Sequence, residues 1–351
     1  MCPKDASRNT ACFRGGTIIC TVGMPFLAVC TNHINCQDKT MQYMKLFIFL
    51  KCIVVAQIVS AEMNHPYPER PLTAEKIAQE VYFNLHGMHQ KNAAIRKTGG
   101  EVALIINRLP GRGVNINTLE AFLKNDFDDG VTESKQLAIF KSGKMKGTGI
   151  LMTNYIESDR YPSISIWLPS MRKVRRIVAP NQADKWMGTN MTYGDVYLRK
   201  PEHESHELLE TTIFADCLDS IHLSEDEKTK RTKKLPQGSC APKGKEVYRL
   251  KSTTKFKDWW YDYRLTDIDI NTFSPYRSIY YKDDKSVKII EADWKSLDKS
   301  DPRLTVPTYV YSKSIKNGQE SMLIIPFSTI ELNTDLPERF WSEKTLRKIK
   351  R

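Results

Sequence analysis

Most of the chain after residue 88 alternates between apolar and polar residues with a period of two, and this pattern limits the fold more than any other feature. Such alternation is typical of β-strands, in which successive side chains point to opposite faces of a sheet. The clearest segments, rich in β-branched and aromatic residues, are 150–153, 163–168, 246–251, 260–270, 276–281, 287–295, 308–312 and 322–332. The chain is therefore predicted to fold mainly as a β-sheet.

Turn residues between these segments indicate antiparallel pairing. Asn317-Gly318 separates two of them and is the strongest hairpin signal in the chain. Residues 282–285, which read Lys-Asp-Asp-Lys, separate two others. Residues 114–126 are ambiguous, because their apolar positions suit a helix while their flanks suit a strand.

One amphipathic helix is predicted near the start of the folded region, over about residues 73–88. Thr73 suits the N-cap, and the chain leaves the helix near Gly87. The apolar positions at helical spacing are Ala74, Ile77, Ala78, Val81, Leu85 and Met88.

A single helix with many antiparallel strands predicts an α+β fold with one domain. A strongly curved antiparallel sheet, or half-open β-barrel, wrapped over one or more helices satisfies both patterns. Several strands carry apolar residues on both faces. We therefore expect the concave side to have more apolar surface than one helix covers, and such a surface is where ligands bind.

The segment 44–61 has the features of a secretory signal peptide. Lys45 precedes an apolar run, and Val59-Ser60-Ala61 suits the cleavage position. A transmembrane anchor is the alternative, but the run has only about 14 residues and is interrupted by Lys51, whereas a span needs about 20. We expect export, with cleavage after Ala61.

Residues 1–43 fit poorly before a signal peptide. They hold five of the eight cysteines and show no clear element. We expect them to be a gene-model extension or disordered, with translation starting at Met41 or Met44. The folded domain is then 62–351.

Two cysteines, Cys217 and Cys240, remain after cleavage. A pair of thiols in an exported chain suggests one disulfide, because such compartments are oxidising. The bond would tether a charged run at 225–234 that cannot bury itself. Free thiols are the alternative.

Charge and motifs give little support for nucleic-acid binding or catalysis. The formal net charge is +12, of which 62–351 carries +8, and this excess favours an ordinary basic surface. His203 and His206 are three residues apart, whereas zinc proteases need four, so we expect a solvated loop there. We expect no nucleic-acid partner, cofactor, metal or catalytic residue.

Two segments carry a family resemblance. Residues 167–177 read WLPSMRKVRRI and residues 186–196 read WMGTNMTYGDV. They resemble the outer membrane lipoprotein-sorting protein family, a LolA-like periplasmic group with the pattern LP-x-x-x-x-VRRI followed by F-MGSDF-x-YED. Here Trp186 replaces Phe, Thr189-Asn190-Met191 replaces Ser-Asp-Phe, and Gly194 replaces Glu. Residues 146–151 and 336–346 resemble two further motifs, so the likeness covers about 145–346.

The resemblance implies a half-open barrel closed by helices, with an apolar cavity that shields acyl chains crossing the periplasm. Each buried methylene contributes about 0.8 kcal/mol, so about 16 carbons offer near 12 kcal/mol before entropic losses. We expect a periplasmic carrier or accessory protein that binds lipid or lipoprotein acyl chains, with a possible inner-membrane transporter and outer-membrane acceptor as partners. The alternatives are a non-carrier envelope adaptor or sensor associated with a membrane transporter, and a hydrolase of envelope lipids.

The candidate functional residues lie in and around these motifs. Candidates for the cavity or its rim are Ile150, Met152, Ile164, Ile166, Leu168, Trp186, Met187 and Tyr193. For Trp186, Met187 and Tyr193 the alternative is packing at the rim of the barrel. Arg172, Arg175 and Arg176 are candidates for binding a headgroup or an acidic partner. The alternative is a structural ion pair with Asp195 or a similar acid.

Overall fold

The computed structural model describes residues 65–177, 181–196, 199–233, 235–297, 300–334 and 336–349, and β-strands make up most of their regular secondary structure. Residues Pro66–Arg351 form one compact unit. The expected signal peptide at 44–61 and the segment 1–43 lie outside the described residues. The strands are β1 (Asn92–Ile95), β2 (Ala103–Leu109), β3 (Gly113–Lys124), β4 (Thr132–Phe140), β5 (Gly149–Tyr155), β6 (Ser163–Leu168), β7 (Lys173–Ile177), β8 (Glu204–Ile213), β9 (Glu246–Thr254), β10 (Tyr263–Asp269), β11 (Pro275–Lys282), β12 (Lys285–Ser296), β13 (Thr305–Ser314), β14 (Glu320–Ile324) and β15 (Ile330–Leu332).

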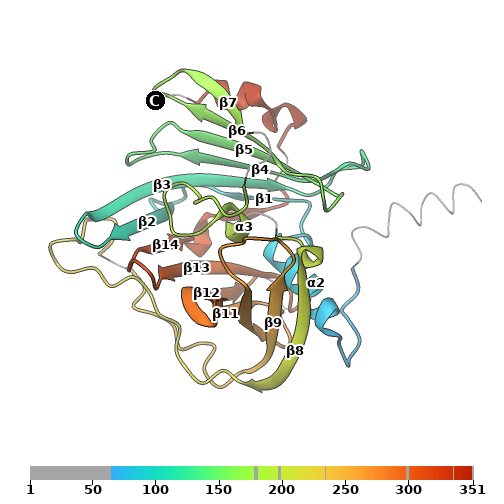
Figure 1. Cartoon of the computed structure of the whole chain (residues 1–351). Helices are drawn as coiled ribbons and strands as arrows, with labels where there is room; N and C mark the ends of the chain where they lie inside the picture. The colour runs from blue at the N-terminus through green and yellow to red at the C-terminus, as the bar shows by residue number, and fades with distance from the viewer. Residues whose placement is uncertain are drawn as a thin grey trace, which may run out of the picture. The chain divides into compact units, whose positions relative to one another are not determined.

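Within the described part of the chain, these 15 strands form one antiparallel sheet (Figure 1). Its order is β7-β6-β5-β4-β3-β2-β14-β13-β12-β11-β10-β9-β8, and β1 pairs with β3 and β15 beside this path. No pairing among the described residues joins β7 to β8, so the sheet is open. The prediction of a large antiparallel sheet is confirmed.

Local turn chemistry sets several of these pairings, as the sequence indicated. Asp283 and Asp284 both have positive φ (50° and 55°), the backbone of a type I′ turn, between β11 and β12. Gly318 has φ 65° in the connection from β13 to β14. The helical alternative for 114–126 is wrong, because this segment forms β3.

Strand pairing defines two faces of the sheet. The inner face carries Ile105, Leu119 and Ala138, and the outer face carries their chain neighbours, such as Ile106 and Leu137. All five side chains are buried. Because both faces are covered, apolar residues on both sides of a strand do not by themselves indicate a free surface.

The chain's own segments cover the outer face. Residues between β8 and β9, including Phe214 and Ile221, pack against Ile106 of β2 and Tyr311 of β13. The predicted disulfide is confirmed here, since Cys217 is bonded to Cys240. At the other end of the sheet, η3 (Glu338–Phe340) and α4 (Glu343–Arg347) follow the last strand, and Trp341 and Leu346 pack against β3–β5.

The predicted helix is α2 (Ala74–Leu85), which contacts the inner face. The Thr73 side chain accepts a hydrogen bond from the Lys76 backbone N–H (3.1 Å), so Thr73 is the N-cap as expected. Ile77 and Val81 pack against β9 and β10. Among the described residues, no helix has the length and apolar character needed to cross a membrane.

Candidate functional site

The second motif segment forms a loop, residues 186–196, that lies on the inner face. Its Asn190 fixes it to β13 and β14: the Ser312 hydroxyl donates to Asn190 Oδ1 (2.5 Å), and the Asn190 backbone N–H donates to the Ser321 hydroxyl (3.1 Å). Trp186 and Tyr193 of this loop are buried among inner-face residues of β2–β6. The motif therefore closes part of the interior.

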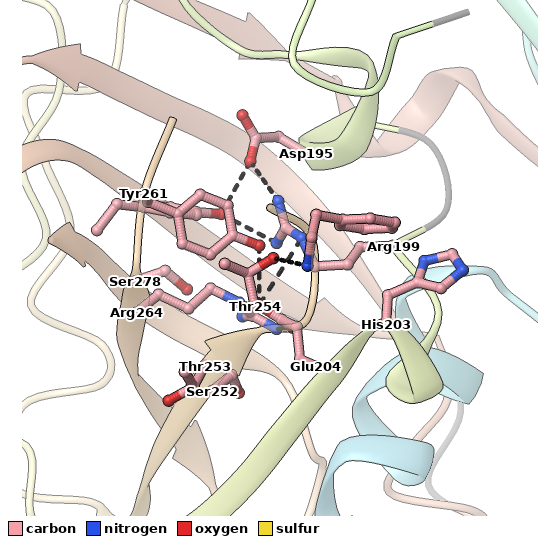
Figure 2. Close-up of polar contacts among 12 residues, drawn as sticks. Asp195, Arg199, His203, Glu204, Ser252, Thr253, Thr254, Tyr261, Arg264 and Ser278 are labelled. Carbon is pink, nitrogen blue, oxygen red and sulfur yellow. Dashed lines mark hydrogen bonds and ion pairs between the residues drawn. The ribbon is translucent and has the colours of Figure 1, made fainter. Parts of the chain in front are cut away.

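The loop ends in α3 (Tyr193–Val196), which delivers Asp195 to a buried polar cluster (Figure 2). The Asp195 carboxylate accepts hydrogen bonds from Lys288 Nζ (2.5 Å), Arg199 Nη2 (3.0 Å) and the Tyr280 hydroxyl (2.9 Å). It also accepts from the backbone N–H (2.8 Å) and hydroxyl (2.9 Å) of Thr192, which fix the start of the helical turn.

A second carboxylate, Glu204, lies on the other side of Arg199. Arg264 donates to it through Nη2 (2.7 Å) and Nε (3.1 Å), in the bidentate geometry that Arg prefers, and the Tyr261 hydroxyl donates at 2.9 Å. The Arg199 guanidinium lies 5.1 Å from the Tyr261 ring centre and 5.6 Å from that of Tyr280, within cation–π range.

Strand register brings the cluster together. Arg264 of β10 lies opposite Tyr280 of β11, and Tyr280 lies opposite Lys288 of β12. Residues opposite one another share a face, so three consecutive strands direct these side chains inward. Glu204 begins β8, and together with Asp195 it supplies the acids that the three strands lack.

Burial and neighbouring charges determine the protonation of the cluster. Burial disfavours the ionised form of Asp195, but Lys288 and Arg199 more than offset it and hold the Asp195 pKa below its usual range. Burial also opposes ionisation of Glu204, yet Arg264 and Arg199 lower its pKa to about 2. Burial lowers the pKa of Lys288, and Asp195 counters this change. Both carboxyls are therefore ionised at neutral pH.

A cavity of about 170 Å³ with both polar and apolar walls adjoins the cluster, and we call it the polar cavity because the charged groups of the cluster line it. Its wall includes α2 and inner-face residues of β8–β13. The polar groups on the wall include Asp195, Arg199, Lys200, Glu204, His206, Arg264, Thr266, Ser278 and Tyr280.

An apolar cavity of about 330 Å³ lies next to the polar one and opens to solvent. Leu85, His86, Val196 and Trp294 line both cavities, so the two are adjacent. The volume is within the range of about 300–1,000 Å³ that small-molecule sites occupy.

Small side chains help to leave this apolar space unfilled. Four alanines line it: Ala93, Ala103, Ala121 and Ala138. Ala121 lies opposite Ala138 in the β3–β4 register, so two short side chains meet at one point of the wall. Larger residues at these positions would fill the interior.

The structure places most of the sequence-selected cavity candidates in the core beside this space. Trp186 lines the apolar cavity. Ile150, Met152, Ile164 and Tyr193 are buried in one cluster with Trp186, and the half-buried Ile166 and Met187 pack against it. Leu168 is half-exposed at the end of β6. The cavity-lining residues that sequence reasoning missed come from α2 and β1–β4 and from the segments of β12–β15, and no local pattern in the sequence marks them.

The three arginine candidates lie apart from the cavities. Arg172 occupies the turn between β6 and β7 with φ 50°, and Arg175 and Arg176 are exposed on the edge strand β7. Arg176 Nε donates to Glu343 of α4 (2.6 Å), so Arg176 forms the structural ion pair that was the alternative, with Glu343 as the acid in place of Asp195. Arg176 points to the outer face of the sheet, whereas Asp195 lies on the inner face. Arg176 lies opposite Ser165, whose hydroxyl also donates to Glu343 on the outer face.

The expectation of a solvated loop around His203 and His206 is wrong. His203 ends η1 (Pro201–His203), and His206 lies in β8. The His206 ring is within hydrogen-bond distance of the Ser252 hydroxyl and the Pro201 carbonyl (both 2.9 Å). Among the described residues, no group of three His, Cys, Asp or Glu side chains is arranged to hold a metal ion.

A family model described as an uncharacterized protein matches residues 132–222. Comparison with the curated proteins gives no match.

Solved structures show the fold. One from Vibrio parahaemolyticus, described as an outer membrane lipoprotein-sorting protein domain, is 15% identical and covers 78% of this chain and 98% of its own, with a TM-score of 0.59. A DUF1329 family protein from Desulfovibrio piger is 14% identical, with the same coverages and a TM-score of 0.58. A LolA superfamily protein from Nitrosomonas europaea is 14% identical, covers 78% of this chain and 100% of its own, and gives a TM-score of 0.50. The resemblance first noted in the sequence is confirmed, and this chain shares the fold of these proteins.

Proposed function

We propose that this chain is a non-enzymatic carrier or accessory protein that binds lipid, or the acyl chains of lipoproteins, in the apolar cavity. The observation that carries the proposal is that cavity: about 330 Å³, open to solvent, and lined mostly by apolar side chains. Each methylene transferred from water into it contributes about 0.8 kcal/mol, so several buried carbons give useful affinity without covalent chemistry.

We propose that the protein acts in the periplasm, in the sorting or export of outer-membrane lipoproteins. The segment 44–61 supports export, and the description of the Vibrio parahaemolyticus structure supports lipoprotein sorting. In this role the chain would receive its guest from an inner-membrane transporter and pass it to an outer-membrane acceptor. The curled sheet and α2 would together enclose the guest.

Filling the cavity tests the proposal. Ala121→Phe adds a ring where two alanines face each other, and the matched control Ala241→Phe makes the same change at an exposed position. Binding is measured by displacement of a fluorescent acyl probe, and native mass spectrometry of protein isolated from the periplasm detects retained lipid. We expect Ala121→Phe to lose binding while its melting temperature stays near that of the control.

Two results would contradict the carrier function. One is wild-type protein that neither retains lipid nor binds the probe, which would favour an adaptor or sensor without a guest. The other is equal binding by Ala121→Phe and Ala241→Phe, which would place the guest elsewhere on the protein.

A further inference from the structure

The buried polar cluster carries more positive than negative charge. It contains three cations and two anions: Arg199, Arg264 and Lys288 against Asp195 and Glu204. Their side chains are from 0% to 16% exposed. The cluster therefore holds one uncompensated positive charge away from bulk water.

The other titratable groups on the wall of the polar cavity do not supply the missing negative charge. Lys200 is paired with Glu133 (3.3 Å), so this pair is neutral as a whole. His86 and His206 are held in the uncharged form, because burial lowers the pKa of each, to about 4 for His86.

Arg199 is the cation with an unused donor. Its Nε is buried without a hydrogen-bond partner, and the nearby Glu204 Oε1 is 3.9 Å away, too far for a hydrogen bond. The Arg199 side chain is 7% exposed and lines the polar cavity. An unpaired buried donor on a charged group is costly, so an anion in this cavity would be strongly favoured.

The polar cavity has room for a small anionic group. Its volume of about 170 Å³ is far above the roughly 15 Å³ that one water molecule requires. The Thr266 and Ser278 hydroxyls on its wall lie 3.0 Å apart, and Arg264 donates to Thr266 Oγ1 (3.0 Å). These hydroxyls can turn to donate to a bound oxygen.

The adjacent cavities suit the two ends of one amphiphile. We propose that the polar cavity binds the anionic headgroup, a carboxylate or phosphate, of a lipid whose acyl tail occupies the apolar cavity. Leu85, His86, Val196 and Trp294, which line both cavities, surround the junction of head and tail. This inference rests on the proposed carrier function and specifies its ligand as an anionic amphiphile.

Ligands with one tail and different heads test the headgroup site. Wild-type protein is titrated with oleate, with dodecyl phosphate, with oleyl alcohol and with inorganic phosphate, under conditions in which the acids are ionised. We expect oleate to bind at least tenfold more tightly than oleyl alcohol, and dodecyl phosphate to bind more tightly than inorganic phosphate.

Two variants of Ser278, one charged and one neutral, test whether the positive charge of the polar cavity selects the ligand. Ser278→Asp supplies an internal carboxylate near Arg264, whereas Ser278→Asn has nearly the same shape without the charge. We expect Ser278→Asp to lose the preference for oleate over the alcohol, and Ser278→Asn to keep it. Arg199→Gln should also lose the preference, and binding of oleyl alcohol shows whether that variant has folded.

The outcomes separate this inference from the carrier function. Equal affinity of wild-type protein for oleate and oleyl alcohol would overturn the headgroup site and leave the carrier function standing. Inorganic phosphate that binds as tightly as dodecyl phosphate would assign the site to a free anion and overturn the lipid assignment. Failure of every tailed ligand to bind would overturn both.

Discussion

Removing the Asp195 carboxylate should destabilise the fold more than any single change on the surface. Asp195→Asn keeps the size of the side chain but removes the charge that Lys288 and Arg199 share. Those cations are only 6% and 7% exposed, so water cannot replace the lost partner. Breaking a buried ion pair from one side costs about 3–5 kcal/mol, and we expect a loss of that size.

A second change should recover part of this loss. Lys288 lies 3.7 Å from the Trp260 ring centre and 5.2 Å from that of Tyr280, in surroundings that accept an apolar chain. Lys288→Met keeps the length of the side chain and removes the stranded cation. We therefore expect Asp195→Asn with Lys288→Met to be more stable than Asp195→Asn alone by at least about 1 kcal/mol, the range in which residues in contact couple.

Urea unfolding of the four proteins in this cycle measures the effect. With a slope of about 3 kcal/mol per molar urea, Asp195→Asn should lower the midpoint by about 1 to 1.7 M with the slope unchanged. Asp184→Asn is the control, because Asp184 lies exposed on the connection leading into the same loop. A loss below about 1 kcal/mol for Asp195→Asn, or simple additivity of the two changes, would refute a buried charge network.

Three further measurements address other parts of the fold. The pKa of Glu204 falls from its usual 4.5 to about 2, so ionised Glu204 contributes about 3 kcal/mol to stability above about pH 4.5, and this contribution is lost toward pH 2. The free energy of unfolding in urea should therefore fall between pH 6 and pH 3, and Glu204→Gln should make it depend less on pH. Replacing Cys217 and Cys240 by Ser opens a loop spanning 23 residues and should lower the free energy of unfolding by about 3 kcal/mol, and an unchanged urea midpoint would contradict this. Arg176→Ala removes an ion pair whose arginine is 71% exposed, so calorimetry should show no resolvable change in melting temperature, and a clear drop would mean that Glu343 needs this partner to hold α4 in place.

The parts of the fold that depend on near neighbours could be predicted from the sequence. The Asp283–Asp284 turn and the Thr73 cap are determined within a few residues, and both were predicted where they occur. β3 was ambiguous for a physical reason. Leu119 packs on the inner face and Phe122 on the outer, because the C-terminal segment covers that side, and a strand buried on both faces loses its alternating pattern.

The candidate site depends on distant residues and could not be predicted in the same way. Asp195 and Lys288 are 93 positions apart, and Glu204 and Arg264 are 60 apart. The sequence indicated an ion pair for Arg176, but its partner Glu343 lies 167 positions away and is reached only when α4 folds onto β6 and β7. Such contacts follow from sheet register, which local patterns do not specify.

The charge cluster also explains why an apolar cavity persists beside it. Moving the loop 186–196 inward to close the space would break the bond from Lys288 to Asp195 and those that hold Asn190 to β13 and β14. Losing one buried ion pair costs about 3–5 kcal/mol, as much as burying about four to six methylenes contributes, so collapse gives no net gain. If the cluster fixes the loop in this position, the double variant with Asp195→Asn and Lys288→Met should regain stability and yet bind the acyl probe less well than wild type. Full binding by that double variant would mean that the shape of the sheet alone keeps the cavity open.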